Sequence, residues 1–144
     1  MPLAVRSFAH ATPDHDAAVA LRRRILRTPL GLDFTAGQLA AEAGDLHLAA
    51  FADGKMVATV VLTPYDATTF KLRQMAVDED QRGTGVGSRL LAAAEDLARR
   101  EGGSRIVLAA RVSAEDFYRR NGYASEGDVY TEVTIPHIRM SKSL

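Results

Sequence analysis

A glycine-rich turn between residues 82 and 88 carries the clearest chemical signal in this sequence. It contains Gly83, Gly85 and Gly87, follows an apolar segment typical of a strand, and precedes the longest helical pattern of the chain. Glycines remove the Cβ atoms that keep a ligand away from backbone N–H groups, and the first turn of a helix offers unpaired N–H donors. The pattern predicts a site for phosphate groups, such as a pyrophosphate, although a tight connection without a ligand is the alternative.

The spacing of this turn differs from that of two common phosphate motifs. No Gly-Lys-Ser/Thr follows the glycines, as a Walker loop requires, and the glycines are not spaced as in the dinucleotide fingerprint. The remaining pattern is Arg82, two residues, Gly85, one residue and Gly87. A nucleotide-binding domain that holds Mg²⁺ is therefore disfavoured.

Two motifs of the chain resemble the GNAT superfamily of N-acetyltransferases. The turn, followed by Ser88-Arg89-Leu90-Leu91, closely resembles the superfamily's loop for the coenzyme A pyrophosphate. Downstream, Ala114-x-x-Phe117-Tyr118-x-x-x-Gly122-Tyr123 is similar to a later helix of that superfamily and the strand after it. The ending Ile135-Pro136-His137-Ile138-x-Met140 resembles that of the ElaA-like branch. The resemblance covers residues 46–140 and leaves the acceptor-binding part without a counterpart.

The resemblance implies an N-acetyltransferase that moves an acetyl group from acetyl-coenzyme A to a primary amine by direct attack in a ternary complex. In the superfamily, the strand before the loop splays away from its neighbour, and the pantetheine arm lies in the gap. Arg111 stands where Asn or Gln is expected, and it contacts the cofactor or the acceptor or is a surface cation. The implied cofactor-binding residues are Met75, Ala76, Val77, Arg82, Gly83, Thr84, Gly85, Val86, Gly87, Ser88, Arg111 and Phe117.

Tyr118 and His137 are the catalytic candidates. Tyr118 matches the tyrosine that the family places near the thioester sulfur, and a phenol with a reference pKa of about 10 is a proton donor at neutral pH. Packing in the core is the alternative for Tyr118. Deprotonating a lysine-like acceptor at pH 7 costs about 4.6 kcal/mol, against about 1 kcal/mol for an α-amino group, so the need for a base depends on the acceptor. His137, Glu42, His47 and a water chain are the candidates for this base, and a structural role for His137 stays open.

The elements that must position these residues alternate between strand and helix patterns. Strands are expected over 5–8, 46–52, 56–62, 68–77, 106–110 and 135–140. Helices are expected from Thr12, after a capping box at Thr35, over 85–100, and from a second capping box at Ser113 to Asn121. The basic run Arg22–Arg24 is interpreted as a solvated face of the first helix, and residues 28–35 as a loop.

The strand at 68–77 contains a change of face. Phe70 and Leu72 share one parity, whereas Met75 and Val77 share the other. Because successive side chains of a strand point to opposite faces, this pattern predicts a bulge near Arg73-Gln74. The Asp53-Gly54 turn joins the two preceding strands as a hairpin, so the sheet is expected to be antiparallel there.

Composition and charge describe one ordinary domain. Of 144 residues, 47% are apolar and 25% charged, and Lys plus Arg equals Asp plus Glu at 18 each. This balance disfavours nucleic acid and anionic membranes as partners. The absence of cysteine excludes disulfides, and the four dispersed histidines predict no metal site. Because no secretory signal or transmembrane segment is visible, we expect a cytoplasmic protein.

Together these features predict one mixed α/β (α+β) domain over residues 1–144 with a GNAT-like fold. Its central sheet should be mostly antiparallel, twisted and splayed around a coenzyme A cleft, with about four flanking helices. The expected partners are acetyl-coenzyme A and a small-molecule or peptide amine acceptor, and the protein should be a monomer or homodimer. The alternative function is a non-catalytic acyl-CoA-binding sensor or regulatory module.

Overall fold

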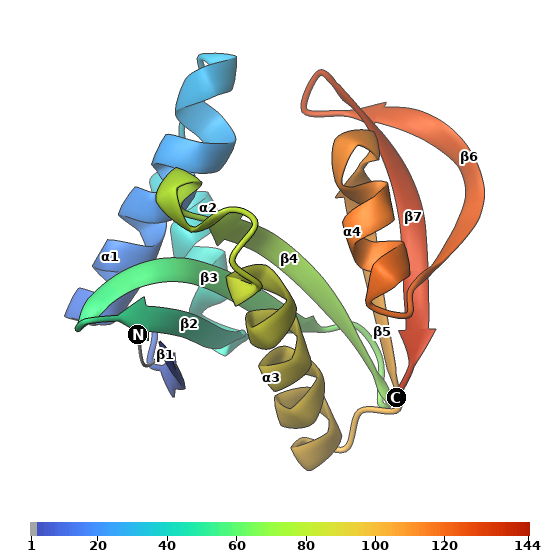
Figure 1. Cartoon of the computed structure of the whole chain (residues 1–144), viewed down its shortest axis with the longest axis horizontal. Coiled ribbons are helices and arrows are strands. Elements are labelled where there is room, and N and C mark those ends of the chain that lie inside the picture. Colours follow the sequence, from blue (N-terminus) through green and yellow to red (C-terminus); the bar gives the residue numbers. More distant parts are fainter. Residues whose placement is uncertain (1–2) are drawn as a thin grey trace.

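Seven strands form one mixed sheet in the computed structural model of the protein, which describes residues 3–144 (Figure 1). The spatial order is β1-β2-β3-β4-β5-β7-β6, and every neighbouring pair is antiparallel except β4 and β5, which are parallel. The expected mixed, mostly antiparallel sheet is thereby confirmed. The strands are β1 (Leu3–Phe8), β2 (Leu46–Ala52), β3 (Lys55–Pro64), β4 (Thr69–Val77), β5 (Arg105–Arg111), β6 (Ala124–Glu132) and β7 (Ile135–Ser143).

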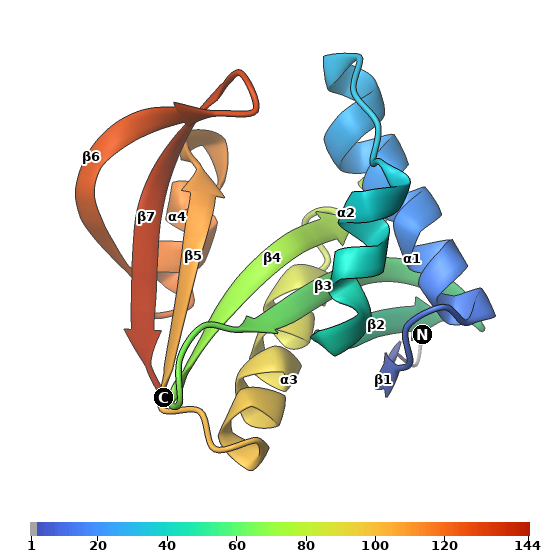
Figure 2. The ribbon, with the colours of Figure 1, turned by 180° about the vertical axis from the view of Figure 1, so that it is seen from behind.

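Four α-helices cover the two faces of the sheet. They are α1 (Pro13–Arg22), α2 (Ala36–Ala40), α3 (Val86–Arg100) and α4 (Glu115–Arg120). Helices α3 and α4 lie in front of the sheet in Figure 1, whereas α1 and α2 lie in front of it in the reverse view of Figure 2. The helices of the first half of the chain and those of the second half therefore lie on opposite faces of the sheet.

The helix ends follow local sequence signals in the first half of the chain. The Thr12 side chain accepts a hydrogen bond from the His15 amide at the start of α1, and Pro13 occupies the first turn. The predicted capping box of Thr35 and Gln38 opens α2. After α1 the chain continues through a π-helical turn (Arg23–Arg27). A 3₁₀ turn (Thr28–Leu30) follows, at the start of the segment 28–35 where a loop was expected.

Two local predictions are wrong. Ser113 does not cap α4, because a 3₁₀ turn over Val112–Ala114 precedes that helix and no side chain caps it. Arg22 is not part of a solvated face, since its side chain is fully buried and paired with Glu42. The error at Ser113 concerns local backbone geometry, whereas the error at Arg22 arises from a partner 20 positions away in the sequence.

The main core lies between the sheet and α3. Leu90 and Leu91 are at most 1% exposed, and burying each such side chain contributes roughly 1.5–3 kcal/mol to folding. Their helix packs against the inner strands, where Leu62, Leu72 and Ile106 belong to the same buried cluster. This core fixes the position of the helix whose N-terminus follows the glycine-rich turn. No helix among residues 3–144 is long and apolar enough to cross a membrane.

The predicted bulge in β4 is confirmed. Val61 of β3 pairs with Arg73, but Thr59 pairs with Ala76, so β4 contains one extra residue in this interval. Gln74 takes up the irregularity with a φ of 55°. As a result, Phe70 and Leu72 before the bulge and Met75 and Val77 after it all belong to the core that α3 and α4 cover.

Candidate active site

A cleft opens where β4 and β5 separate. The two parallel strands pair only over Thr69–Leu72 and Arg105–Leu108, and beyond these residues they diverge, as Figure 1 shows. The resulting cleft has a volume of about 360 Å³. Its lining includes Met75 of β4, Arg111 of β5, Tyr118 of α4 and His137 of β7. Four of the residues that the sequence singled out therefore lie around one opening.

Tyr118 presents a protonated hydroxyl in this cleft. The residue is 7% exposed, and its ring packs edge-on against Phe117 and Tyr123 at centroid distances of 5.1 and 5.7 Å. The hydroxyl donates to the Met75 sulfur at 3.5 Å, which is a weak acceptor, so the O–H group can turn to a stronger one. Burial raises the pKa of Tyr118 above its usual value, which keeps the phenol neutral.

His137 offers a proton acceptor on the adjoining strand. Its Nδ1 lies 2.8 Å from the carbonyl oxygen of Ile135. A carbonyl can only accept, so Nδ1 carries a hydrogen, and in the tautomer that is protonated at Nδ1 alone Nε2 has a lone pair. Nε2 lies 3.8 Å from a carboxylate oxygen of Glu132. The histidine is thus held in one orientation by the backbone, with its second nitrogen beside an acid.

The glycine-rich turn forms the N-terminal end of α3. Gly83 and Gly85 have φ angles of 77° and 85°, which L side chains rarely adopt, and a Cβ atom at either position would meet open space. The first backbone bond of the helix runs from the Arg89 amide to the Gly85 carbonyl. The amides of the first turn, from Gly85 to Ser88, precede that bond and have no partner within the helix.

Gly87 has a different reason to be glycine. A Cβ atom there would lie 3.3 Å from the Phe117 ring and 3.6 Å from Val77. The missing side chain lets α3 approach α4 and β4 closely. Asn121 joins the same two helices, because its side-chain amide donates to the Ser88 hydroxyl at 3.2 Å and to the Phe117 carbonyl at 2.8 Å. Phe117 therefore packs on the turn rather than in the cleft.

The turn and the cleft are linked by the end of β4. Residues 82–88 do not line the cleft, but Met75 does, and Val77 contacts the Gly87 position. Ala76 lies between them and is buried. At the turn itself, the Arg82 side chain is exposed, and the Thr84 hydroxyl donates to the Gln81 carbonyl. Val86 is buried beneath the start of α3. A ligand that reaches both places would run along these β4 residues.

Three arginines line the cleft, and the sequence had singled out only one of them. Arg111 donates to the carbonyl oxygen of Leu26 at 3.1 Å, and Arg27 and Arg73 join it from the π-helical turn and from β4. Burial lowers the pKa of Arg27, and the nearby charges of Arg111 and Arg73 lower it further. No local motif marks Arg27 or Arg73, because only the packing of α1 against β4 brings them to this place.

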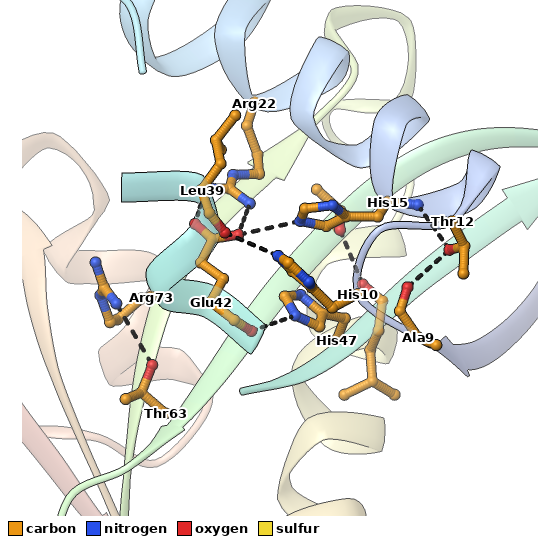
Figure 3. Close-up of polar contacts among 12 residues, drawn as sticks. Ala9, His10, Thr12, His15, Arg22, Leu39, Glu42, His47, Thr63 and Arg73 are labelled. Carbon is orange, nitrogen blue, oxygen red and sulfur yellow. Dashed lines mark hydrogen bonds and ion pairs between the residues drawn. The ribbon is translucent and has the colours of Figure 1, made fainter. Parts of the chain in front are cut away.

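Glu42 and His47, two of the candidate bases, lie in a separate buried cluster (Figure 3). Arg22 holds both carboxylate oxygens of Glu42, at 2.8 and 2.5 Å, and His15 Nε2 approaches one of them at 3.3 Å. His47 Nε2 lies 3.1 Å from the Glu42 backbone carbonyl. Neither candidate lines the cleft.

The same cluster contains a possible ligand set for a metal ion. Single donor atoms of His15, Glu42 and His47 lie within 4.8 Å of one another, a convergence that the dispersed histidines of the sequence did not suggest. The guanidinium of Arg22 occupies the carboxylate, however, and a cation beside it would be repelled. We therefore attribute the cluster to the buried ion pair.

Comparison with known proteins gives a consistent result. Residues 6–123 match the family model described as the acetyltransferase (GNAT) family. A UPF0039 protein of Schizosaccharomyces pombe is 34% identical over 95 residues, which span 65% of this chain and 63% of that protein. The fold matches Escherichia coli ElaA with a TM-score of 0.84 at 18% identity, over 98% of this chain and 99% of the other. It also matches an aminoglycoside 6'-N-acetyltransferase complexed with coenzyme A, with a TM-score of 0.78 at 20% identity, over 97% and 96% of the two chains.

Proposed function

The chain belongs to the acetyltransferase (GNAT) family, and on this premise we propose that it transfers an acetyl group from acetyl-coenzyme A to a primary amine. The observation that carries the proposal is the separation of β4 from β5, which opens a cleft between the Tyr118 hydroxyl and His137. The family membership supports acyl transfer as the reaction class. The residues that perform it are argued below from their chemistry.

The glycine-rich turn suits the pyrophosphate of coenzyme A. The backbone amides from Gly85 to Ser88 have no partner within α3, and no Cβ atom at Gly83 or Gly85 blocks a ligand that approaches them. The dipole of this 15-residue helix also favours negative charge at its N-terminal end. Met75 and Val77 would bind the pantetheine and acetyl parts through their backbone, because β4 lacks a strand partner on the β5 side after Leu72. Ala76 and Phe117 would shape the wall of this channel.

Acetyl-coenzyme A supplies the acyl group as a thioester. The ammonium form of the acceptor first loses a proton to solvent. The neutral amine nitrogen then forms a C–N bond to the acetyl carbon while the C–S bond breaks, and its surplus proton passes to His137 Nε2. Tyr118 donates its hydrogen bond to the departing sulfur. Reference pKa values of about 10 for a phenol and about 8.5 for a thiol already make complete proton transfer uphill by about 2 kcal/mol, and burial raises the pKa of Tyr118 further. Tyr118 therefore stabilises the thiolate chiefly by hydrogen bonding.

A titration of acetyl-coenzyme A into the protein, followed by calorimetry, tests the cofactor site. The variant Gly85→Asp adds a carboxylate where a Cβ atom meets open space, and Asp tolerates this backbone and caps helices well. Gly85→Asn is the matched control, because it has the same shape without the charge. We expect Gly85→Asp to weaken binding about tenfold or more relative to Gly85→Asn, with similar melting temperatures.

Two results would separate the possible functions. Folded native protein that binds no acetyl-coenzyme A would contradict the proposal. Tight binding without acetyl transfer to any amine of a broad library would instead favour the non-catalytic acyl-CoA sensor.

A further inference from the structure

Three arginines of the cleft have no carboxylate of the described residues within ion-pair distance. Arg27, Arg73 and Arg111 are half-buried, and within residues 3–144 none of them takes part in an ion pair. Burial is the largest cause that lowers the pKa of Arg27, and the charges of Arg111, Arg22 and Arg73 lie close enough to lower it further. Partly buried charges of one sign are costly unless something compensates them, so the arrangement favours an anionic ligand.

Most hydrogen-bond donors of these guanidinium groups are unused by the protein. Each guanidinium has five N–H groups. Arg111 gives one hydrogen bond to Leu26 at 3.1 Å, and Arg27 gives one to the same carbonyl at 3.3 Å. Arg73 has a single long contact of 3.5 Å with the Thr63 hydroxyl, which Figure 3 shows. The remaining donors suit a carboxylate or phosphate, which guanidinium binds in a bidentate manner.

These arginines lie on the side of the cleft opposite the glycine-rich turn. Arg111 contacts Leu26, which follows α1 on the face seen in Figure 2. Arg73 has the opposite parity to Phe70 and Leu72, which pack in the core beneath α3. The proposed pyrophosphate site is at α3 on the other face, so the pyrophosphate would not compensate these charges, and a second anion would.

Within residues 3–144, Glu132 of β6 is the one acid in the lining of this cleft. A carboxylate oxygen of Glu132 lies 3.8 Å from His137 Nε2. The negative charge of Glu132 raises the pKa of Arg27 and so partly offsets the lowering by burial and by the other arginines. Lys71 also lines the cleft. The described residues around the cleft therefore combine a positive region with a single carboxylate beside the candidate base, an arrangement complementary to a molecule that carries an anion and an amine.

We propose that the acetyl acceptor is an amine that also carries a carboxylate or phosphate group, and that Arg27, Arg73 and Arg111 bind this group. Glu132 attracts the ammonium form of the amine toward His137. This inference rests on the proposed acetyl transfer and narrows its substrate class.

Two matched pairs of amines test the inference and distinguish the two anions. The pairs are 4-aminobutyrate with butylamine for the carboxylate, and phosphoethanolamine with ethanolamine for the phosphate. The rate of thiol release from acetyl-coenzyme A gives kcat/KM for each amine. We expect the anionic member of at least one pair to have a kcat/KM about tenfold or more above that of its neutral partner, with a preference that decreases as salt is added. The pair with the larger ratio identifies the anion.

Arg73→Gln is the most informative variant, because Arg73 has the weakest contacts within the protein. We expect it to lower the anionic-to-neutral ratio of kcat/KM about tenfold, and Arg73→Lys to retain more of that ratio. Arg100→Gln is the matched control, since Arg100 is exposed at the far end of α3. A second readout is calorimetric titration of both anionic amines into the protein saturated with coenzyme A, which needs no turnover.

The outcomes separate the inference from the proposed function. If folded protein neither binds acetyl-coenzyme A nor acetylates any of the four amines, the proposed function fails and the inference fails with it. If acetyl-coenzyme A binds, but the anionic amines neither bind the coenzyme A complex nor react faster than their neutral partners, only the inference is overturned. An anionic preference that Arg73→Gln and Arg100→Gln leave equally unchanged also overturns it.

Discussion

The buried ion pair between Arg22 and Glu42 should be the most sensitive single interaction in the α1 side of the fold. Arg22 is 0% exposed and Glu42 is 3% exposed, and two hydrogen bonds of 2.8 and 2.5 Å join their charged ends. The Phe34 ring covers the guanidinium at 4.6 Å. Replacing Glu42 by Gln keeps the size of the side chain but leaves the guanidinium buried without a counter-charge.

The expected cost of Glu42→Gln is about 3–5 kcal/mol, the usual penalty for removing one partner of a buried pair. For a chain of this length each kcal/mol lowers the melting temperature by about 3 °C, so the variant should melt roughly 10–15 °C below the native protein. Thermal denaturation followed by circular dichroism measures this shift. Glu101→Gln, an exposed glutamate in a matched substitution, should change the free energy of unfolding by less than about 0.5 kcal/mol.

A double variant separates the effect of charge from that of packing. Arg22→Met with Glu42→Leu removes both charges and fills similar volume, so it should recover most of the stability that Glu42→Gln loses. A loss below about 1 kcal/mol for Glu42→Gln would refute the reasoning, because the guanidinium would then find water or another partner. A double variant as unstable as the single one would also refute it, since packing rather than charge balance would be responsible.

Two further predictions concern the cleft and the histidine cluster. Tyr118→Phe keeps the packed ring and should lower kcat about 10- to 100-fold, with the Kd for acetyl-coenzyme A changed less than about threefold; an unchanged kcat would contradict its role as donor. Burial lowers the pKa of His47, and the charge of His15 adds to this effect, so the unfolded chain takes up a proton first as the pH falls below about 6.5. The free energy of unfolding should therefore fall between pH 7.5 and 5.5, by at most about 1.4 kcal/mol per pH unit for this group, and urea denaturation of His47→Gln should show a flatter dependence. An equal slope in both proteins would contradict the assignment.

Most features that depend on neighbouring residues were predictable from the sequence, and the cap expected at Ser113 is the exception. The parity change at Met75 located the bulge, Thr35 and Gln38 located the start of α2, and the glycines at 83 and 85 located the turn before α3. Each of these signals is set by backbone geometry within a few residues. The mixed sheet and its helices were predictable for the same reason, with the family resemblance giving their arrangement.

Features that depend on distant partners were not predictable. Arg22 was interpreted as solvated because nothing near it in sequence announces Glu42, which α2 and the following turn bring beneath α1. Glu42 was a candidate base because nothing near it in the sequence shows that Arg22 holds its carboxylate. The convergence of Arg27 and Arg73 with Arg111 likewise requires three segments to meet. The roles of Tyr118 and His137 remain predictions that the proposed experiments test.

The single extra residue in β4 changes which side chains of this strand face α1 and which face α4. Before the bulge at Gln74, Leu72 faces the core under α3 and Arg73 faces the side of α1. After it, Met75 faces α4 and approaches the Tyr118 hydroxyl. Without the extra residue the parity after Gln74 would reverse, and Ala76 rather than Met75 would face α4. The bulge therefore places the Arg73 and Met75 side chains on opposite faces of the same strand, two residues apart. In the proposed reaction, one strand would thus contribute both to the acceptor side and to the cofactor side.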